Sequence, residues 1–159
     1  MINPVIKSLV LLNCIFSLPL QGHEDDGPEH LIEHLRARSA KGEPQAVYLL
    51  ASEYDRGEIL VKNEKKAFEL YRQAAGLGSS AAQWVLASKY STGKGVKKDK
   101  VEAYKWALLS AEYGSIVAQK LIPKFEKELS TGEKEKGQSL AAQWQDNFKK
   151  QNDKNSDDS

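Results

Sequence analysis

The chain has 159 residues, of which 40% are hydrophobic and 28% are charged, so it is neither wholly disordered nor a multi-spanning membrane protein. Its 23 lysines and arginines against 22 acidic residues give a net charge of +1, which does not favour a nucleic-acid binder or a polybasic membrane binder. The single cysteine, Cys14, excludes an internal disulfide framework and a cysteine-based zinc site.

Residues 1–22 have the pattern of a secretory signal peptide. Lys7 precedes an apolar run at 8–20, and these 13 residues are too few for a membrane-spanning helix, which needs about 20. Gly22 is a small residue suited to the cleavage site. We therefore expect an exported protein, periplasmic or secreted, with no stable membrane insertion once this segment is removed.

Cys14 offers an alternative route to the envelope, because a lipoprotein is anchored through an acylated cysteine. Such signals have a small residue before the cysteine, and here Asn13 occupies that place. The next segment, 23–28, contains three acidic residues, and we expect it to form a flexible start of the mature chain. His23 at a new N-terminus could chelate copper through its amine and imidazole, although a flexible terminus is the simpler interpretation.

The rest of the chain repeats itself with a period of 36 residues. A shift of this length gives 11 identities in 36 positions, among them the pairs Ala46 and Ala82, Leu50 and Leu86, Tyr54 and Tyr90, and Gly57 and Gly93. Ala46, Leu50 and Tyr54 have the i, i+4, i+8 spacing of one helical stripe, and Gly57 follows where that helix must end. Asn63 and Asp99 suit the N-caps of the second helices in the two units. Each unit is therefore predicted to be a helical hairpin whose remaining apolar face is covered by its neighbour.

Two full units are predicted by this register, at 46–81 and 82–117. A partial unit precedes them, with only its second helix, at about 29–41. Terminal units of a solenoid are usually atypical, because they must close the core. Together with a closing segment, these units form a predicted solenoid over residues 29–148.

The C-terminal end departs from the repeat. Ser130 and Glu133 have the S-x-x-E spacing of a capping box, which predicts the start of a last helix. Trp144 and Phe148 are four residues apart on this helix and could lie back over the final unit. The last residues, 149–159, lack apolar side chains and are predicted to be a disordered tail.

A known family is recognisable in the second unit. The segment from Ala82 to Tyr90, followed by Gly93-Lys94-Gly95-Val96 and Asp99, resembles a Sel1-like repeat. The first unit departs from this pattern, because Ile59 stands where Gly95 does. The nearest rival is the tetratricopeptide repeat, whose usual unit is 34 residues. The resemblance implies an all-α, right-handed α/α solenoid of about three Sel1-like, tetratricopeptide-like hairpins with a C-terminal capping helix.

One short motif could indicate catalysis. His30-Leu31-Ile32-Glu33-His34 has the form H-x-x-E-H, in which His30 and His34 could share a metal while Glu33 acts as a base. A catalytic zinc site needs a third protein ligand, which the pattern does not supply. Two surface histidines on a partial helix are the simpler interpretation. We therefore predict no catalytic residue, no metal and no cofactor, and keep an envelope metal-dependent hydrolase as the alternative.

The resemblance implies a protein-interaction scaffold. First helices of a superhelical array tend to line its concave side, where a protein or peptide segment docks. We predict that the binding residues are those of the first helices that the repeat does not dictate: Val47, Leu49, Ser52, Glu53, Gln83, Val85, Ser88 and Lys89. Tyr48 and Trp84, at equivalent positions, are assigned a structural role. An immunity-type inhibitor of a secreted toxin is a further possibility on the same scaffold.

Enzymatic activity is not implied by the resemblance. Some cysteine-rich Sel1 relatives are associated with penicillin binding, and their hallmark is a cysteine pair in each repeat. That pair is missing here, because Cys14 is the only cysteine in the chain. The sequence therefore predicts a non-enzymatic adaptor with a protein partner.

Overall fold

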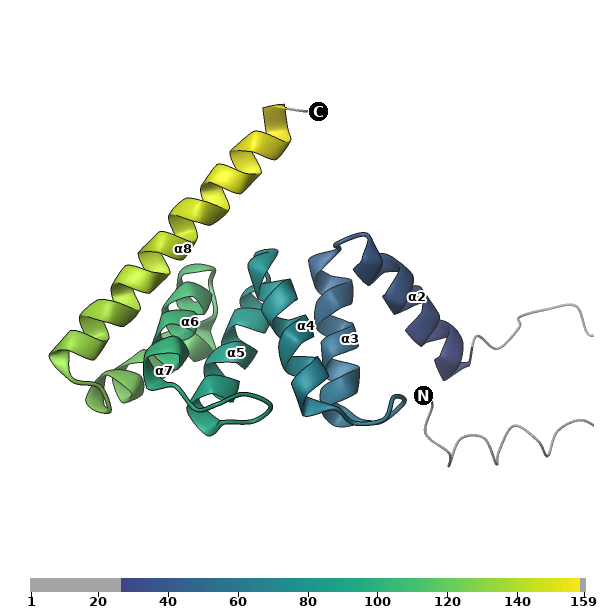
Figure 1. Cartoon of the computed structure of the whole chain (residues 1–159), viewed down its shortest axis with the longest axis horizontal. Coiled ribbons are helices and arrows are strands. Elements are labelled where there is room, and N and C mark those ends of the chain that lie inside the picture. Colours follow the sequence, from purple (N-terminus) through teal and green to yellow (C-terminus); the bar gives the residue numbers. More distant parts are fainter. Residues whose placement is uncertain (1–26, 158–159) are drawn as a thin grey trace, which may run out of the picture.

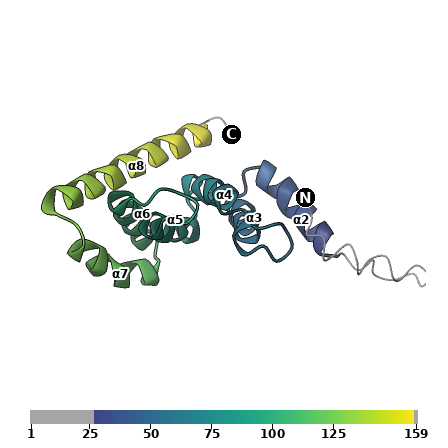
Figure 2. The same ribbon diagram turned by 60° about the horizontal axis from the view of Figure 1, so that its bottom comes forward.

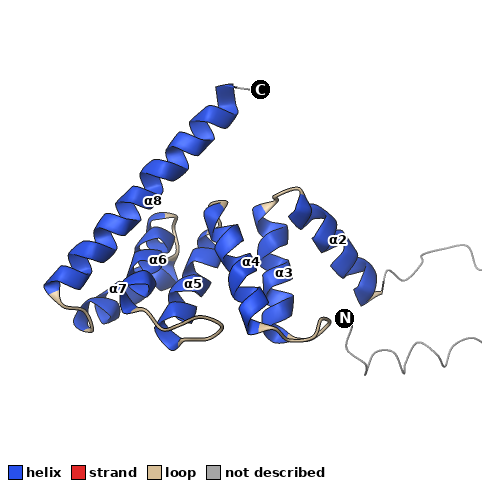
Figure 3. Cartoon of the chain, viewed as in Figure 1, coloured by secondary structure: helices blue, strands red, loops and turns tan. Residues whose placement is uncertain are grey.

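The computed structural model describes residues 27–157, and the predicted signal peptide at 1–22 lies outside this range. Within it, all regular secondary structure is helical, and the helices stand side by side along the molecule (Figures 1 and 3). The seven helices are α2 (Pro28–Ala40), α3 (Pro44–Arg56), α4 (Glu64–Gly76), α5 (Ser80–Thr92), α6 (Lys100–Glu112), α7 (Ile116–Lys127) and α8 (Thr131–Asp157). None of these helices is long and apolar enough to cross a membrane.

The helices keep the 36-residue period from α2 to α7. The second helices α2, α4 and α6 begin at residues 28, 64 and 100, and the first helices α3, α5 and α7 begin at residues 44, 80 and 116. The predicted all-α solenoid of hairpins is therefore confirmed. Within the described range α2 has no first helix of its own, and this leaves Leu31 48% exposed, whereas the equivalent alanines, Ala67 and Ala103, are buried.

The ends of the helices follow the predicted signals. The Asn63 side chain accepts a hydrogen bond from the Lys66 backbone N–H at 2.9 Å, and Asp99 accepts two at the start of α6. Gly57 and Gly93 end α3 and α5 in the left-handed conformation, with φ of 77° and 81°. These caps confirm the N-cap and C-cap positions that the sequence predicts.

The core is built on first helices that are covered from two sides. The helix α3 packs against both α2 and α4, and α5 packs against both α4 and α6. On α3 the predicted stripe of Ala46, Leu50 and Tyr54 is buried, and so is a second stripe formed by Val47 and Ala51. A helix covered by two neighbours must have an apolar arc wider than that of a surface helix.

The turn between α5 and α6 requires glycine at its centre. Gly95 has a φ of +75°, and a Cβ atom at this position would lie 2.3 Å from the carbonyl oxygen of Glu64 at the start of α4. In the first unit Ile59 takes the equivalent place and packs against the core, beside the buried Leu60. The second turn is therefore held closer to its neighbouring helix than a side chain would permit.

The last helix crosses α6. In Figure 2, α8 and α7 lie on opposite sides of α6, and the packing of α8 is chiefly against α6. Gly137 permits this approach, because a Cβ there would lie 2.7 Å from the ring of the buried Tyr104. Further along, Trp144 stacks on Phe148 with ring centroids 4.9 Å apart. Trp106 of α6 contacts the Trp144 ring, which confirms that this helix covers the final full unit.

The predicted disordered tail at 149–159 is corrected by the structure. The helix α8 continues to Asp157, so most of that segment is helical. The spacing of apolar residues could not predict this part of the helix, because the side chains of residues 149–154 are all exposed. The helix continues because no glycine or proline interrupts residues 138–157, and an anchored helix extends at low cost once its first turns are formed.

Candidate functional site

The first helices α3, α5 and α7 form one side of the solenoid, which we call the first-helix face. Of the eight predicted binding residues, Leu49 and Ser88 are exposed on it, and Leu49 is 39% exposed. Three more of the predicted residues are partly accessible: Ser52, Glu53 and Val85. Val85 packs partly against the core, and one carboxylate oxygen of Glu53 is buried without a hydrogen-bond partner among the described residues.

The binding role predicted for three of these residues is wrong, because the structure buries their side chains. Val47 and Gln83 are 0% exposed and Lys89 is 3% exposed. Val47 and Gln83 occupy equivalent positions in the second buried stripe of their helices. A first helix is covered by the preceding unit as well as by its own second helix, and these positions therefore face protein and not solvent.

Lys89 makes an internal ion pair that closes the junction between α3 and α5. Its ammonium lies 2.7 Å from the carboxylate of Asp55 on α3 and 5.6 Å from the centroid of the Tyr71 ring on α4. Burial raises the pKa of Tyr71 to about 12, an effect that the hydroxyl of Ser52 partly opposes by hydrogen bonding. Lys89 therefore does not mark a partner surface, since its charge is used within the fold.

The next junction on the first-helix face is open. A groove of about 210 Å³ lies between α5 and α7, and its lining residues are Trp84, Ser88, Ser91, Leu121, Lys124, Phe125 and Glu128. A shift of 36 residues places Asp55 on Ser91 and Lys89 on Phe125. The groove therefore exists where the second junction lacks the ion pair that fills the first. We call it the α5–α7 groove.

The two aromatic residues at equivalent positions have different roles. Tyr48 packs against Tyr71 of its own hairpin, with ring centroids 5.7 Å apart. In the second unit the partner position is Ala107, and Trp84 lines the α5–α7 groove instead. Both side chains are partly exposed and pack against the core, as the predicted structural role requires, and Trp84 in addition lines the groove.

The α7 side of the groove was missed by sequence reasoning. Leu121, Lys124 and Phe125 all lie on the third first helix. The 36-residue register could have indicated this groove, because it aligns Phe125 with Lys89. The charged residue at the junction of α3 with α5 is thus an aromatic residue at the junction of α5 with α7. The prediction stopped at the two full units and therefore did not use this alignment.

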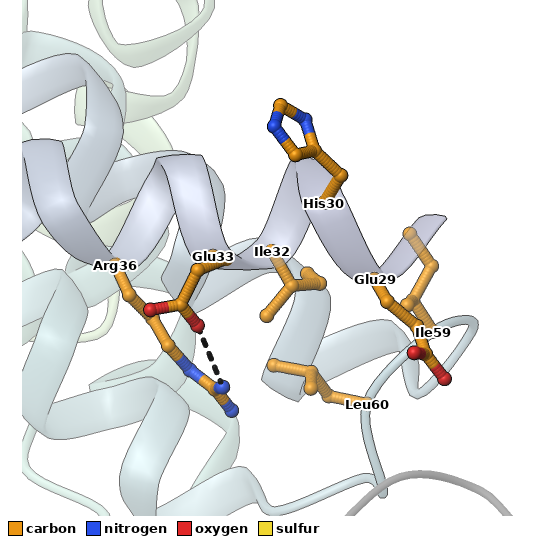
Figure 4. Close-up of a pocket in the computed structure, with 7 residues that line it drawn as sticks. All are labelled: Glu29, His30, Ile32, Glu33, Arg36, Ile59 and Leu60. Atoms are coloured by element: carbon orange, nitrogen blue, oxygen red, sulfur yellow. Dashed lines mark ion pairs between the residues drawn. The ribbon is translucent and has the colours of Figure 1, made fainter. Parts of the chain in front are cut away.

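The H-x-x-E-H segment lies on α2 at the other end of the solenoid. His30 and His34 are exposed, and Glu33 makes an ion pair with Arg36 at 3.7 Å (Figure 4). A pocket of about 330 Å³ lies beside them, over Ile32 and Leu60. Within residues 27–157 no three histidine, cysteine or acidic side chains are grouped so that they could hold a metal ion. The motif therefore has no third ligand in the described part of the chain.

Comparison with known proteins identifies the repeat. The model of the Sel1 repeat family matches residues 44–79 and 80–115, which are the hairpins α3–α4 and α5–α6. A Sel1 repeat protein of known structure from Oxalobacter formigenes is 32% identical, with a TM-score of 0.61, over 63% of this chain and 75% of that chain. The chain belongs to the Sel1 repeat family.

Two further structures are similar to this Sel1 repeat protein. A protective antigen of uropathogenic Escherichia coli strains, which displays an SLR fold, is 28% identical with a TM-score of 0.72, over 80% of this chain. The chain spans only 27% of the length of that antigen. Cysteine rich protein B of Helicobacter pylori is 26% identical with a TM-score of 0.57, over 58% of this chain and 70% of that one. No curated protein matches the chain.

The family bears directly on the class of function. Sel1 repeat proteins are generally protein-interaction scaffolds, and their fold is typically that of a non-enzymatic adaptor. The matched Sel1 units begin two residues before the predicted boundaries at 46 and 82, because each begins with the first residue of its first helix. The Sel1 hairpins therefore coincide with the observed helix pairs.

Proposed function

We propose that this Sel1 repeat protein is a non-enzymatic adaptor of the bacterial envelope, which binds a segment of a partner protein on its first-helix face. The observation that supports this proposal most directly is the α5–α7 groove. It is lined by the rings of Trp84 and Phe125 and by the hydroxyls of Ser88 and Ser91. A groove whose lining combines apolar and polar side chains is suited to a protein segment.

The opposite side of the solenoid is less suited to this role. The outer surface of α6 is covered by α8, whose Trp144 packs against Trp106. The first-helix face has no such cover within the described residues, and Leu49 of α3 is exposed on it. Export is supported by the pattern of residues 1–22, which contain a single charged residue, Lys7.

A photocrosslinking experiment tests the binding face. A photoreactive phenylalanine analogue at Ser88 should give covalent adducts with a partner in the bacterial envelope. The same analogue at Glu69, an exposed residue of α4, is the matched control and should give none. Equal adducts from both positions, or none from Ser88, would contradict the proposal. Signal cleavage is tested by the intact mass of the same exported protein, which should correspond to a chain without residues 1–22.

A further inference from the structure

The α5–α7 groove differs from the junction before it in one specific way. Between α3 and α5 the ammonium of Lys89 and the carboxylate of Asp55 fill the space, 2.7 Å apart. Between α5 and α7 the equivalent residues are Phe125 and Ser91, and a volume of about 210 Å³ remains between the helices. The groove is therefore a junction in which an internal ion pair is replaced by an aromatic ring and a hydroxyl.

The size and lining of the groove suit one large apolar side chain. Pockets for small-molecule ligands usually have about 300–1,000 Å³, so this groove is below that range. Its apolar lining residues are Trp84, Leu121 and Phe125, each of which is partly exposed. Such partly covered aromatic and aliphatic groups are typical of the anchor pockets at protein interfaces.

The rim of the groove on α7 is basic. Lys120, Lys124 and Lys127 are spaced i, i+4 and i+7, so they lie on one side of the helix, and Lys124 itself lines the groove. All three are exposed, and within residues 27–157 none of them forms an ion pair. One carboxylate also lines the groove, that of Glu128.

The surroundings of the groove extend this positive charge. Residues 90–128, which leave out the internally paired Lys89 and include Glu128, contain eight lysines against five acidic residues, whereas the whole chain has a net charge of +1. Glu102 pairs with Lys105 at 3.1 Å, so these two charges cancel within the fold, and Glu126 is held by a hydrogen bond from the Tyr104 hydroxyl at 2.9 Å. An approaching ligand therefore meets a modest excess of positive charge, in which the three lysines of α7 form no ion pair among the described residues.

We propose that the α5–α7 groove binds an acidic protein segment that inserts one large apolar side chain between Trp84 and Phe125, with its carboxylates beside Lys120, Lys124 and Lys127. This inference rests on the proposed function and names the chemistry of the partner. A nucleic acid fits less well, because the site offers room for one inserted group and no row of exposed aromatic rings along a basic channel.

The test uses short fluorescent peptides in which glutamates flank a single phenylalanine, and the affinity is measured by fluorescence anisotropy with the full exported chain. We expect binding that weakens as salt is added, because the contacts are charged. Replacement of the phenylalanine by serine, or of the glutamates by glutamine, should each weaken binding roughly tenfold or more. A peptide that keeps its affinity after both changes would overturn the proposal.

Two protein variants locate the site. Ser91→Asp with Phe125→Lys rebuilds the Asp55–Lys89 pair in the second junction without a change of net charge, and it should lower the affinity roughly tenfold or more. Lys124→Glu should have a similar effect by charge reversal, and it keeps the test decisive if the double variant unfolds. Lys65→Glu on α4 is the control with the same change of charge, and its affinity should equal that of the unmodified chain.

The outcomes separate this inference from the proposed function. Adducts at Ser88 without any binding of the acidic peptides would overturn the chemistry proposed for the groove and leave the adaptor function standing. Equal weakening by Lys124→Glu and Lys65→Glu would also overturn it, since a general charge effect would then explain the binding. So would a single-stranded oligonucleotide that binds more tightly than the peptide and competes with it.

Discussion

Gln83 is the most unusual side chain of the core. It is 0% exposed, and neither its Oε1 nor its Nε2 atom has a hydrogen-bond partner among the described residues. The equivalent residue of the first unit is Val47, which is equally buried. A buried polar group without a partner costs about 1–3 kcal/mol, so this amide lowers the stability of the second unit.

Replacement of this amide should therefore stabilise the protein. We expect Gln83→Met, which conserves the volume of the side chain, to raise the free energy of unfolding by about 1 kcal/mol, measured by urea denaturation. The reciprocal change, Val47→Gln, should lower it by about 1–3 kcal/mol. A loss of stability in Gln83→Met would show that the amide is hydrogen-bonded in solution.

The turn before α6 is the element in which backbone and packing both require glycine. Gly95→Ala should lower the free energy of unfolding by roughly 2–4 kcal/mol, because the positive φ is unfavourable and the Cβ would displace the carbonyl of Glu64. Gly114 is the matched control, since it also has a positive φ of +90° but has open space around it. Gly114→Ala should cost only about 1–2 kcal/mol. Equal losses in thermal or urea denaturation would contradict the role of the close approach.

The helices that the sequence predicts well are those whose signals are local. Leu50 and Tyr54 mark a stripe, Asn63 and Asp99 mark N-caps, and Gly57 marks an end, and each depends only on near neighbours in the chain. These signals were sufficient for the solenoid and for the order of its hairpins.

The binding residues were harder to predict, because they depend on contacts between units. A polar residue in a buried stripe, such as Gln83 or Lys89, has the same appearance in the sequence as a solvent-facing residue. Its burial depends on which helix of the preceding unit covers it. The groove depends in the same way on the pairing of Ser91 with Phe125 across two helices that are not consecutive. Only Leu49 and Ser88 were placed on the exposed surface as predicted.

At the scale of the whole molecule, stability should be distributed along the array. Each hairpin packs chiefly against its neighbours, so a local loss is felt first by the adjacent unit. The helix α8 packs chiefly against α6, and its ring contacts are made by Trp144 and Phe148. The C-terminal end of the solenoid is therefore closed by two aromatic side chains of α8.

Removal of one of these rings should weaken the C-terminal end before the N-terminal end. We expect Trp144→Ala to lower the free energy of unfolding by about 2–4 kcal/mol and to speed hydrogen exchange in α6 more than in α3. Asn147→Ala, an exposed change on the same helix, should leave both unchanged. A uniform increase in exchange across α3 and α6 would indicate a single cooperative unit instead.

The ion pair between Asp55 and Lys89 has a consequence for how such an array can grow. The helices share one period, so a further copy of residues 80–115 would match the spacing of its neighbours. That copy would place a lysine at position 125, opposite Ser91, which supplies no carboxylate. A buried ammonium without a counter-charge is strongly destabilising. The two units are therefore alike in shape but not interchangeable. Their order along the chain depends on the pairing of Asp55 with Lys89.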